Sequence, residues 1–215
     1  MSRVKVGLVR VLTLHDEEAL NVHGRLIEEK FPSLYVISRC IEGFPKGLYN
    51  FEIEKKAIPH IVKLVGEFEK EGVKAVIISC ADDPGVEEAR KRVKIPVIGA
   101  GTAVASVALI YGDRIGVLGI TDEVPRPIKR ILGDRIIGYE KPHNIESTVD
   151  IAKNRDEIIR SAKKLIDLNI DALVLACTGY STARVSDLLK GIIDIPVVDP
   201  VVASGLLTYY LVAVT

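Results

Sequence analysis

The sequence predicts an α/β fold of two pseudo-symmetric lobes, each with a parallel sheet flanked by helices, and an active-site cleft between them. Short runs of β-branched residues alternate with longer, charged segments of helical periodicity. The runs are continuous in their apolar character, which is typical of strands buried on both faces of a parallel sheet. The same pattern occurs twice along the 215 residues, which indicates an internal repeat.

The expected strands alternate with amphipathic helices. Leu20, Ile27 and Phe31 share one face of the first helix, and a later helix has an apolar face of Ile158, Ala162, Leu165 and Ile166. The predicted strands are residues 4–11, 73–79, 96–100, 114–120, 172–176 and 195–199. This order of elements predicts a chain built from βα units.

The repeat sets the expected boundaries of the lobes. Residues 72–80, GVKAVIISC, align without gaps on residues 169–177, NIDALVLAC, and both segments end on a cysteine. Two further matches pair KIPVIGAG with DIPVVDPV and KVGLVRV with RIGVLGI. We therefore expect a first lobe over residues 1–110 and a second over 111–215, with a turn at YGDR where they join.

Charge and composition limit the possible partners. Lys and Arg together number 29, as do Asp and Glu, so charge provides no reason to expect a nucleic-acid or membrane partner. The sequence has no signal-peptide pattern and no apolar run of membrane-spanning length, and its three widely spaced cysteines are expected to be reduced. We expect a cytoplasmic homo-oligomer whose partner is a small-molecule substrate.

Cys80 and Cys177 are the strongest candidates for chemistry. Both follow an apolar strand in matched parts of the repeat, and ligands of open α/β sheets bind outside the carboxyl ends of the strands. A pseudo-two-fold relation would make the two thiols face each other. One thiolate would then remove a proton from a carbon acid while the other thiol returns a proton to the opposite face.

Each cysteine is expected to precede a helix whose N-terminal N–H groups favour a thiolate and an enolate oxygen. After Cys80 we expect Asp83 as the N-cap and Pro84 as the first helical residue. After Cys177, Ser181 or Thr182 is expected to cap the helix.

The segments ISCADDPG and LACTGYS around the two cysteines resemble the aspartate/glutamate/hydantoin racemase superfamily, and within it most closely hydantoin racemases. The resemblance implies a cofactor-independent racemase or epimerase with Cys80 and Cys177 as catalytic residues. It also implies that the helix from 101 packs on the second lobe and the helix from 201 returns to the first. Ala81–Asp82 departs from the Cys-Asn-Thr of amino-acid racemases, and Gly179 stands where glutamate racemases have histidine, which disfavours a free amino acid.

The residues expected to bind the substrate lie beside the cysteines or at other strand ends: Ala81, Asp82, Thr178, Gly179, Arg10, Thr13 and Thr121. The stretch from Arg10 to Thr13 stands where hydantoin racemases typically have an Asn-Pro-Asn-Thr run. Structural alternatives stay open, because Arg10, Thr13 and Thr121 also suit turns. Thr178 and Gly179 also suit a tight strand-to-helix turn.

Other chemistries are disfavoured. Cys40 is expected in the core, and the four histidines show no metal-ligand spacing with the cysteines. The segment GAGTAV has Val104 in place of the third glycine of a dinucleotide fingerprint, and the Cys-x-x-Cys of dithiol redox proteins is absent. We therefore expect no metal and no organic cofactor.

The expected reaction is racemisation or epimerisation of a carbon acid, with hydantoins or related cyclic ureides as the first substrate class. Aspartate or another amino acid comes second, and a lyase or decarboxylase reaction of the same superfamily comes third. A two-lobe ligand-binding protein without catalytic activity is the alternative outside enzymes.

Overall fold

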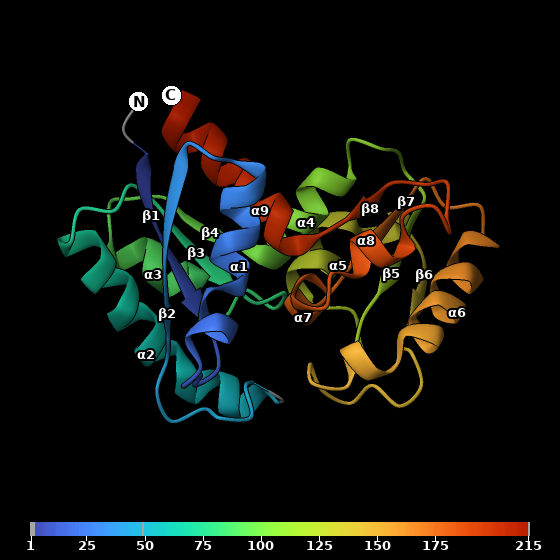
Figure 1. The fold of residues 1–215 in the computed structure, drawn as a ribbon, viewed down its shortest axis with the longest axis horizontal. Coiled ribbons are helices and arrows are strands. Elements are labelled where there is room, and N and C mark those ends of the chain that lie inside the picture. The colour runs from blue at the N-terminus through green and yellow to red at the C-terminus, as the bar shows by residue number, and fades with distance from the viewer. Residues whose placement is uncertain (1–2, 49, 215) are drawn as a thin grey trace. The chain divides into compact units, whose positions relative to one another are not determined.

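The computed structural model describes residues 3–48 and 50–214, which form two compact units (Figure 1). Unit 1 runs to Ala100 and resumes at Ser204, and unit 2 comprises Gly101–Ala203. The α/β prediction is confirmed, because each unit contains a four-stranded sheet in which all pairings are parallel.

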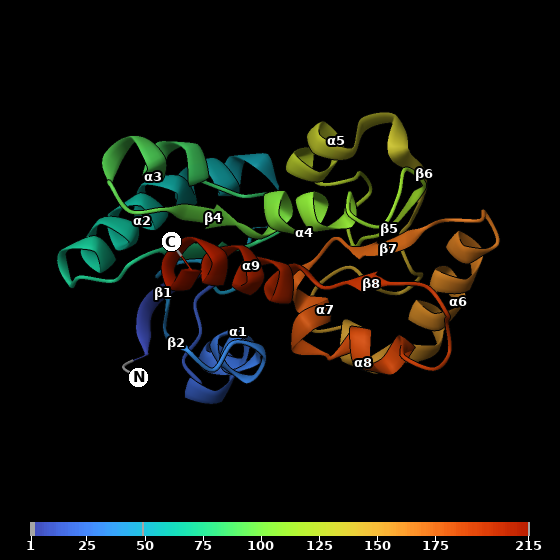
Figure 2. The ribbon, with the colours of Figure 1, turned by 90° about the horizontal axis from the view of Figure 1, so that it is seen from above.

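The elements of unit 1 alternate strand and helix. In chain order they are β1 Val4–Arg10, α1 Glu17–Lys30, β2 Leu34–Cys40, α2 Phe51–Lys70, β3 Val76–Ser79, α3 Val86–Arg92 and β4 Val97–Gly99. The sheet order is β2-β1-β3-β4. Figure 2 shows α2 and α3 on one side of this sheet and α1 with the C-terminal part of α9 on the other.

Unit 2 repeats this plan with shorter helices. Its elements are α4 Ala100–Ala108, β5 Ile115–Leu118, α5 Arg126–Leu132, β6 Ile136–Glu140, α6 Arg155–Ile166, β7 Ala172–Leu175, α7 Thr178–Thr182, α8 Val185–Leu189 and β8 Val197–Val198. The short 3-10 helices η1 Gly133–Arg135 and η2 Ile151–Lys153 precede β6 and α6. The sheet order β6-β5-β7-β8 matches that of unit 1, so the repeat seen in the sequence is also a repeat of topology.

Two helices contain the boundaries between the units. The first boundary falls at the start of α4, so the YGDR segment lies within unit 2, between α4 and β5. The second falls within α9 (Pro200–Tyr209), which continues into a π-helical turn, η3, over Tyr210–Val214. The C-terminal half of α9 packs on α1, because the rings of Phe31 and Tyr209 stack with centroids 5.7 Å apart.

Local sequence explains where the long helices begin. The Asp16 carboxylate accepts the N–H of Ala19 at 2.7 Å and caps α1, and the Asn50 side chain accepts the N–H of Ile53 at 2.9 Å and caps α2. Among the helices built from the described residues, none is both long and apolar enough to cross a membrane.

The strands β2 and β6 were not predicted from the sequence. Both are edge strands, with only one neighbour in their sheets. The residues of β2 alternate between buried and more exposed, and all of β6 is only half-buried. Strands of this kind lack the continuous apolar run that marks a strand covered on both faces.

Candidate functional site

Cys80 directly follows β3, the third strand of unit 1, at the carboxyl end of the sheet. Its backbone forms a tight turn, since its N–H donates to the carbonyl of Ile78 at 3.0 Å and its carbonyl accepts the N–H of Asp83 at 3.2 Å. The side chain is half-buried and packs against the hydrophobic core of unit 1. The residue is therefore held at the strand end and is only partly exposed.

The loop after Cys80 differs from the expected helix start. The helix α3 begins only at Val86, and its N-cap is Gly85 with φ 70°, so the prediction that Asp83 caps this helix is wrong. Asp83 instead adopts φ 52°, and its carboxyl group lies against the Cα of Gly99 at the end of β4. The N-terminal N–H groups of α3 are thus separated from Cys80 by a loop, in which Ala81 is buried and Asp82 is half-buried.

Cys177 follows β7, the third strand of unit 2, after the single residue Ala176. The thiol is itself the N-cap of α7, because Sγ accepts the N–H of Gly179 at 3.3 Å. The prediction that Ser181 or Thr182 caps this helix is therefore wrong. Cys177 is 9% exposed, and its burial raises the pKa of the thiol to about 11, although the N–H groups of Gly179 and Tyr180 oppose this shift.

Gly179 has a structural reason to be glycine. A Cβ at this position would lie 2.8 Å from both Ile151 and Thr148, which cover the start of α7. The N–H of the same residue donates to the Cys177 sulfur. Thr178, between them, is half-buried.

Asp199, directly after β8, has a buried carboxyl group that contacts α7. This residue was not predicted from the sequence as part of the site. Asp199 is 6% exposed, and its Oδ1 accepts the hydroxyl of Ser181 at 2.8 Å. The same oxygen accepts the N–H groups of Val201 and Val202 at 2.9 and 3.0 Å, so Asp199 also caps α9. Its Oδ2 is buried without a hydrogen-bond partner in the described part of the chain. The Asp-Pro step before an apolar helix was the signal in the sequence.

The Asp199 carboxyl makes the stability of the fold depend on pH. Burial raises its pKa above the ordinary 3.8, so the folded protein keeps this proton to higher pH than the unfolded chain does. Its stabilising contribution is complete below about pH 4 and is lost as the pH rises through the raised pKa. We expect Asp199→Asn, which removes the titration, to be more stable than the wild type at about pH 8 but not at about pH 4.

Urea unfolding of the two proteins at these pH values checks this expectation. Asp194→Asn serves as the control, because Asp194 is an exposed carboxyl near the same strand. An identical pH dependence in Asp199→Asn and wild type would contradict the prediction.

Arg10 lies at the end of β1, paired in register with Cys40 on one side and Ser79 on the other. The residue is 7% exposed, and Nη1 donates to the carbonyls of Ala19 and Leu20 at 2.7 and 3.2 Å. Burial lowers the pKa of the guanidinium to about 10, and the nearby Cys40 opposes this shift. The guanidinium is thus already engaged by the backbone of α1.

Ser79, next to Cys80 in the chain, contacts a histidine that the sequence analysis left unassigned. His23 of α1 is 1% exposed, and its Nδ1 lies 2.8 Å from the Ser79 hydroxyl. Nothing in the local sequence around either residue predicts this contact, because 56 positions separate them.

Thr13 and Thr121 take part in loop structure. The Thr13 hydroxyl donates to the carbonyl of Ile41 at 2.9 Å and accepts the N–H of Phe44 at 2.8 Å, so it ties the loop after β1 to the loop after β2. The exposed Thr121 donates to the carbonyl of Glu123 at 2.7 Å, and its own carbonyl accepts the hydroxyl of Tyr139 at 2.6 Å. Roles of both threonines in substrate binding stay predictions.

The predicted residues gather at the carboxyl end of the sheet in each unit. In unit 1 these residues are Arg10, Cys80, Ala81 and Asp82, with Thr13 in a neighbouring loop. In unit 2 they are Thr121, Cys177, Thr178 and Gly179, at the ends of the paired strands β5 and β7. No group of three or more His, Cys, Asp or Glu side chains suited to a metal ion occurs among the described residues.

Comparison with known proteins identifies relatives over most of the chain. The family model of Asp/Glu/hydantoin racemases matches residues 22–204. The hydantoin racemase of Pseudomonas sp. (strain NS671) is 29% identical over 171 residues, covering 74% of this chain and 66% of that protein. That of Rhizobium meliloti is 29% identical over 172 residues, covering 74% and 69%. The chain thus spans about two thirds of the length of these relatives.

The fold has a close counterpart among solved structures. Allantoin racemase from Klebsiella pneumoniae superposes with a TM-score of 0.83 at 18% identity, covering 98% of this chain and 88% of that one. At this identity the likeness establishes the shared fold alone.

Proposed function

The chain belongs to the Asp/Glu/hydantoin racemase family, and from this we propose that it is a racemase or epimerase that uses Cys80 and Cys177 as its acid–base pair. The observation that carries the proposal is the equivalent placement of the two cysteines. Each follows the third strand of a sheet whose strand order is the same in both units. Racemisation needs one such group for each face of the substrate carbon.

The burial of Cys177 suggests how the two protons move. A thiol whose pKa is raised to about 11 is protonated at neutral pH, so Cys177 suits the acid that donates a proton. The thiolate is then assigned to Cys80, whose side chain is more exposed. The Cys80 thiolate takes the proton from the substrate carbon, leaving an enolate, and the Cys177 thiol protonates the opposite face. The mirror-image substrate reacts with the roles exchanged.

We propose a hydantoin or related cyclic ureide as the substrate. Such a ring is neutral, whereas an amino acid would need a cation for its carboxylate. Arg10, a buried cation at the carboxyl end of the unit 1 sheet, already donates to two backbone carbonyls of α1. The hydroxyl of Thr178, beside Cys177, is suited to a neutral carbonyl or N–H edge. The matched relatives named hydantoin racemase support the same class.

Proton exchange at the stereocentre tests the proposal. Single enantiomers of 5-benzylhydantoin and of aspartate are incubated with the protein in D2O, and optical rotation and deuterium at the reacting carbon are followed together. We expect the hydantoin to lose rotation and to gain one deuterium per inversion, because the returned proton comes from a solvent-exchanged thiol. Aspartate should remain unchanged.

Hydantoins also racemise slowly without catalyst, so the double variant Cys80→Ser/Cys177→Ser provides the background rate. Loss of rotation with aspartate alone would contradict the cyclic substrate. Rates equal to the background with both compounds would contradict catalysis and favour a ligand-binding protein.

A further inference from the structure

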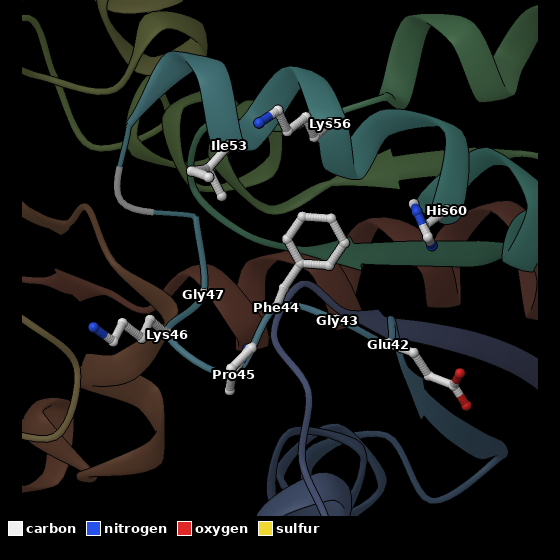
Figure 3. Close-up of a pocket in the computed structure, with 9 residues that line it drawn as sticks. All are labelled: Glu42, Gly43, Phe44, Pro45, Lys46, Gly47, Ile53, Lys56 and His60. Atoms are coloured by element: carbon white, nitrogen blue, oxygen red, sulfur yellow. The ribbon is translucent and has the colours of Figure 1, made fainter.

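Unit 1 contains a cavity of about 530 Å³, which is within the usual size range of small-molecule sites. Loop residues 42–47, which follow β2, form one wall, and Ile53, Lys56 and His60 of α2 form the other. In Figure 3 the ring of Phe44 projects from the loop toward α2. The His60 ring contacts it edge-on, with centroids 5.3 Å apart.

The lining combines an apolar surface with positive charge. Phe44, Pro45 and Ile53 provide the apolar surface, while Lys46 and Lys56 outnumber the single acid, Glu42. Neither lysine has an ion-pair partner in residues 3–48 and 50–214. A ligand that matches this lining has an apolar body and a negatively charged end.

The loop that lines the cavity starts at the same carboxyl end of the sheet as Cys80. The loop begins after Cys40, which pairs with Arg10, and Arg10 pairs with Ser79 beside Cys80. Two strand spacings, about 10 Å in all, therefore separate the two strand ends. Both Phe44 and Cys80 pack against the same hydrophobic core.

Thr13 holds the loop in place relative to this edge. Besides its two side-chain hydrogen bonds, its N–H donates to the carbonyl of Phe44 at 3.0 Å. The carbonyl of Phe44 also accepts the N–H of Gly47 at 3.0 Å, which closes the turn through Pro45 and Lys46. The cavity wall is thus an ordered turn tied to the loop after β1.

We propose that this cavity binds the variable substituent of the substrate, and that it selects substituents with an apolar segment ending in a carboxylate. The inference rests on the proposed function, since it assumes that the reacting carbon lies at Cys80. The ring carbon would sit at the strand end, and the substituent would extend along the loop after β2. The two unpaired lysines would then meet the carboxylate.

The test compares two hydantoins of nearly equal shape, 5-(4-carboxybenzyl)hydantoin and 5-(4-carbamoylbenzyl)hydantoin. The charge lies far from the acidic carbon, so the intrinsic reactivity of the two rings is similar. We expect the wild type to racemise the carboxylate with a kcat/KM about five- to tenfold higher, as two partly exposed ion pairs allow. In the double variant Lys46→Met/Lys56→Met, the ratio of kcat/KM for the carboxylate to that for the amide should fall to about one to two.

The matched control is Lys55→Met/Lys63→Met, which removes the same charge from exposed lysines of α2 that do not line the cavity. It should keep the preference of the wild type. Equal use of both compounds by the wild type, or the same loss of preference in both double variants, would overturn the proposal.

A binding measurement separates this proposal from the proposed racemase activity. If the wild type racemises neither compound, the carboxylate compound is titrated calorimetrically into the same three proteins. A dissociation constant that only Lys46→Met/Lys56→Met weakens, by about fivefold or more, would support the cavity as a binding site although the activity had failed. Absence of binding, or equal binding by all three proteins, would overturn it.

Discussion

We expect Cys80→Ser and Cys177→Ser each to lose racemisation by about 10²-fold or more, the usual effect of removing a general acid or base. A serine hydroxyl is a far weaker acid than a thiol, so it neither gives nor takes the proton at neutral pH. Following optical rotation of an enantiopure 5-substituted hydantoin measures this loss. Cys40→Ser is the matched control, because Cys40 lies at the same sheet edge but contacts the backbone of Leu14.

The two variants should also differ in which enantiomer they still exchange. Each retains one thiol, and that thiol serves one face of the carbon. We therefore expect each variant to exchange deuterium into one enantiomer without inverting it, and the preferred enantiomer to be opposite in the two. Near-full activity in either variant, or exchange of both enantiomers by both, would exclude the two-thiol mechanism.

The second large effect is expected for Gly99→Ala. A Cβ on Gly99 would overlap the carboxyl group of Asp83, which belongs to the turn after Cys80. The overlap includes the γ-carbon of Asp83 as well as both carboxyl oxygens, so the side chain or the turn that carries it must shift to relieve it. We expect a loss of about 1–3 kcal/mol of stability, as for other overpacking substitutions, together with lower racemisation.

Urea unfolding measures the change, and Gly66→Ala is its control. Gly66 lies within α2, and a Cβ there would meet no atom of the described residues within 4 Å. Alanine is favoured over glycine in a helix, so this variant should be about 0.5–1 kcal/mol more stable. An unchanged midpoint for Gly99→Ala would show that the turn after Cys80 is more adaptable than the structure indicates.

The six strands that are rich in continuous apolar residues were predictable from the sequence, whereas β2 and β6 were not. A strand covered on both faces needs apolar side chains at every position, and that requirement is visible in the sequence. An edge strand with exposed positions needs fewer, so its pattern resembles that of a loop or helix. The position of β2 matters to the site, because its end leads into the loop that lines the cavity.

The loop after each cysteine was predicted less well than the cysteine itself. Asp83 and Ser181 have side chains typical of helix caps. The N-cap residues are instead Gly85 for α3, without a side-chain hydrogen bond, and Cys177 for α7. Capping preferences describe which residues suit a helix start, but the strand end and the packing around it decide where the helix starts. Asp83 packs on β4, and Ser181 donates to Asp199.

The α/β class, the internal repeat and the placement of one cysteine directly after a matched apolar strand in each half could all be read from the sequence. These features depend on the order of residue types along the chain, because apolar runs and their spacing follow from burial and strand geometry. The partners of Arg10, Asp199 and His23 became visible only in the folded chain. Each residue is buried where a strand end meets a helix, and the contacts of His23 with Ser79 and of Asp199 with Ser181 join residues 56 and 18 positions apart, which local sequence does not specify.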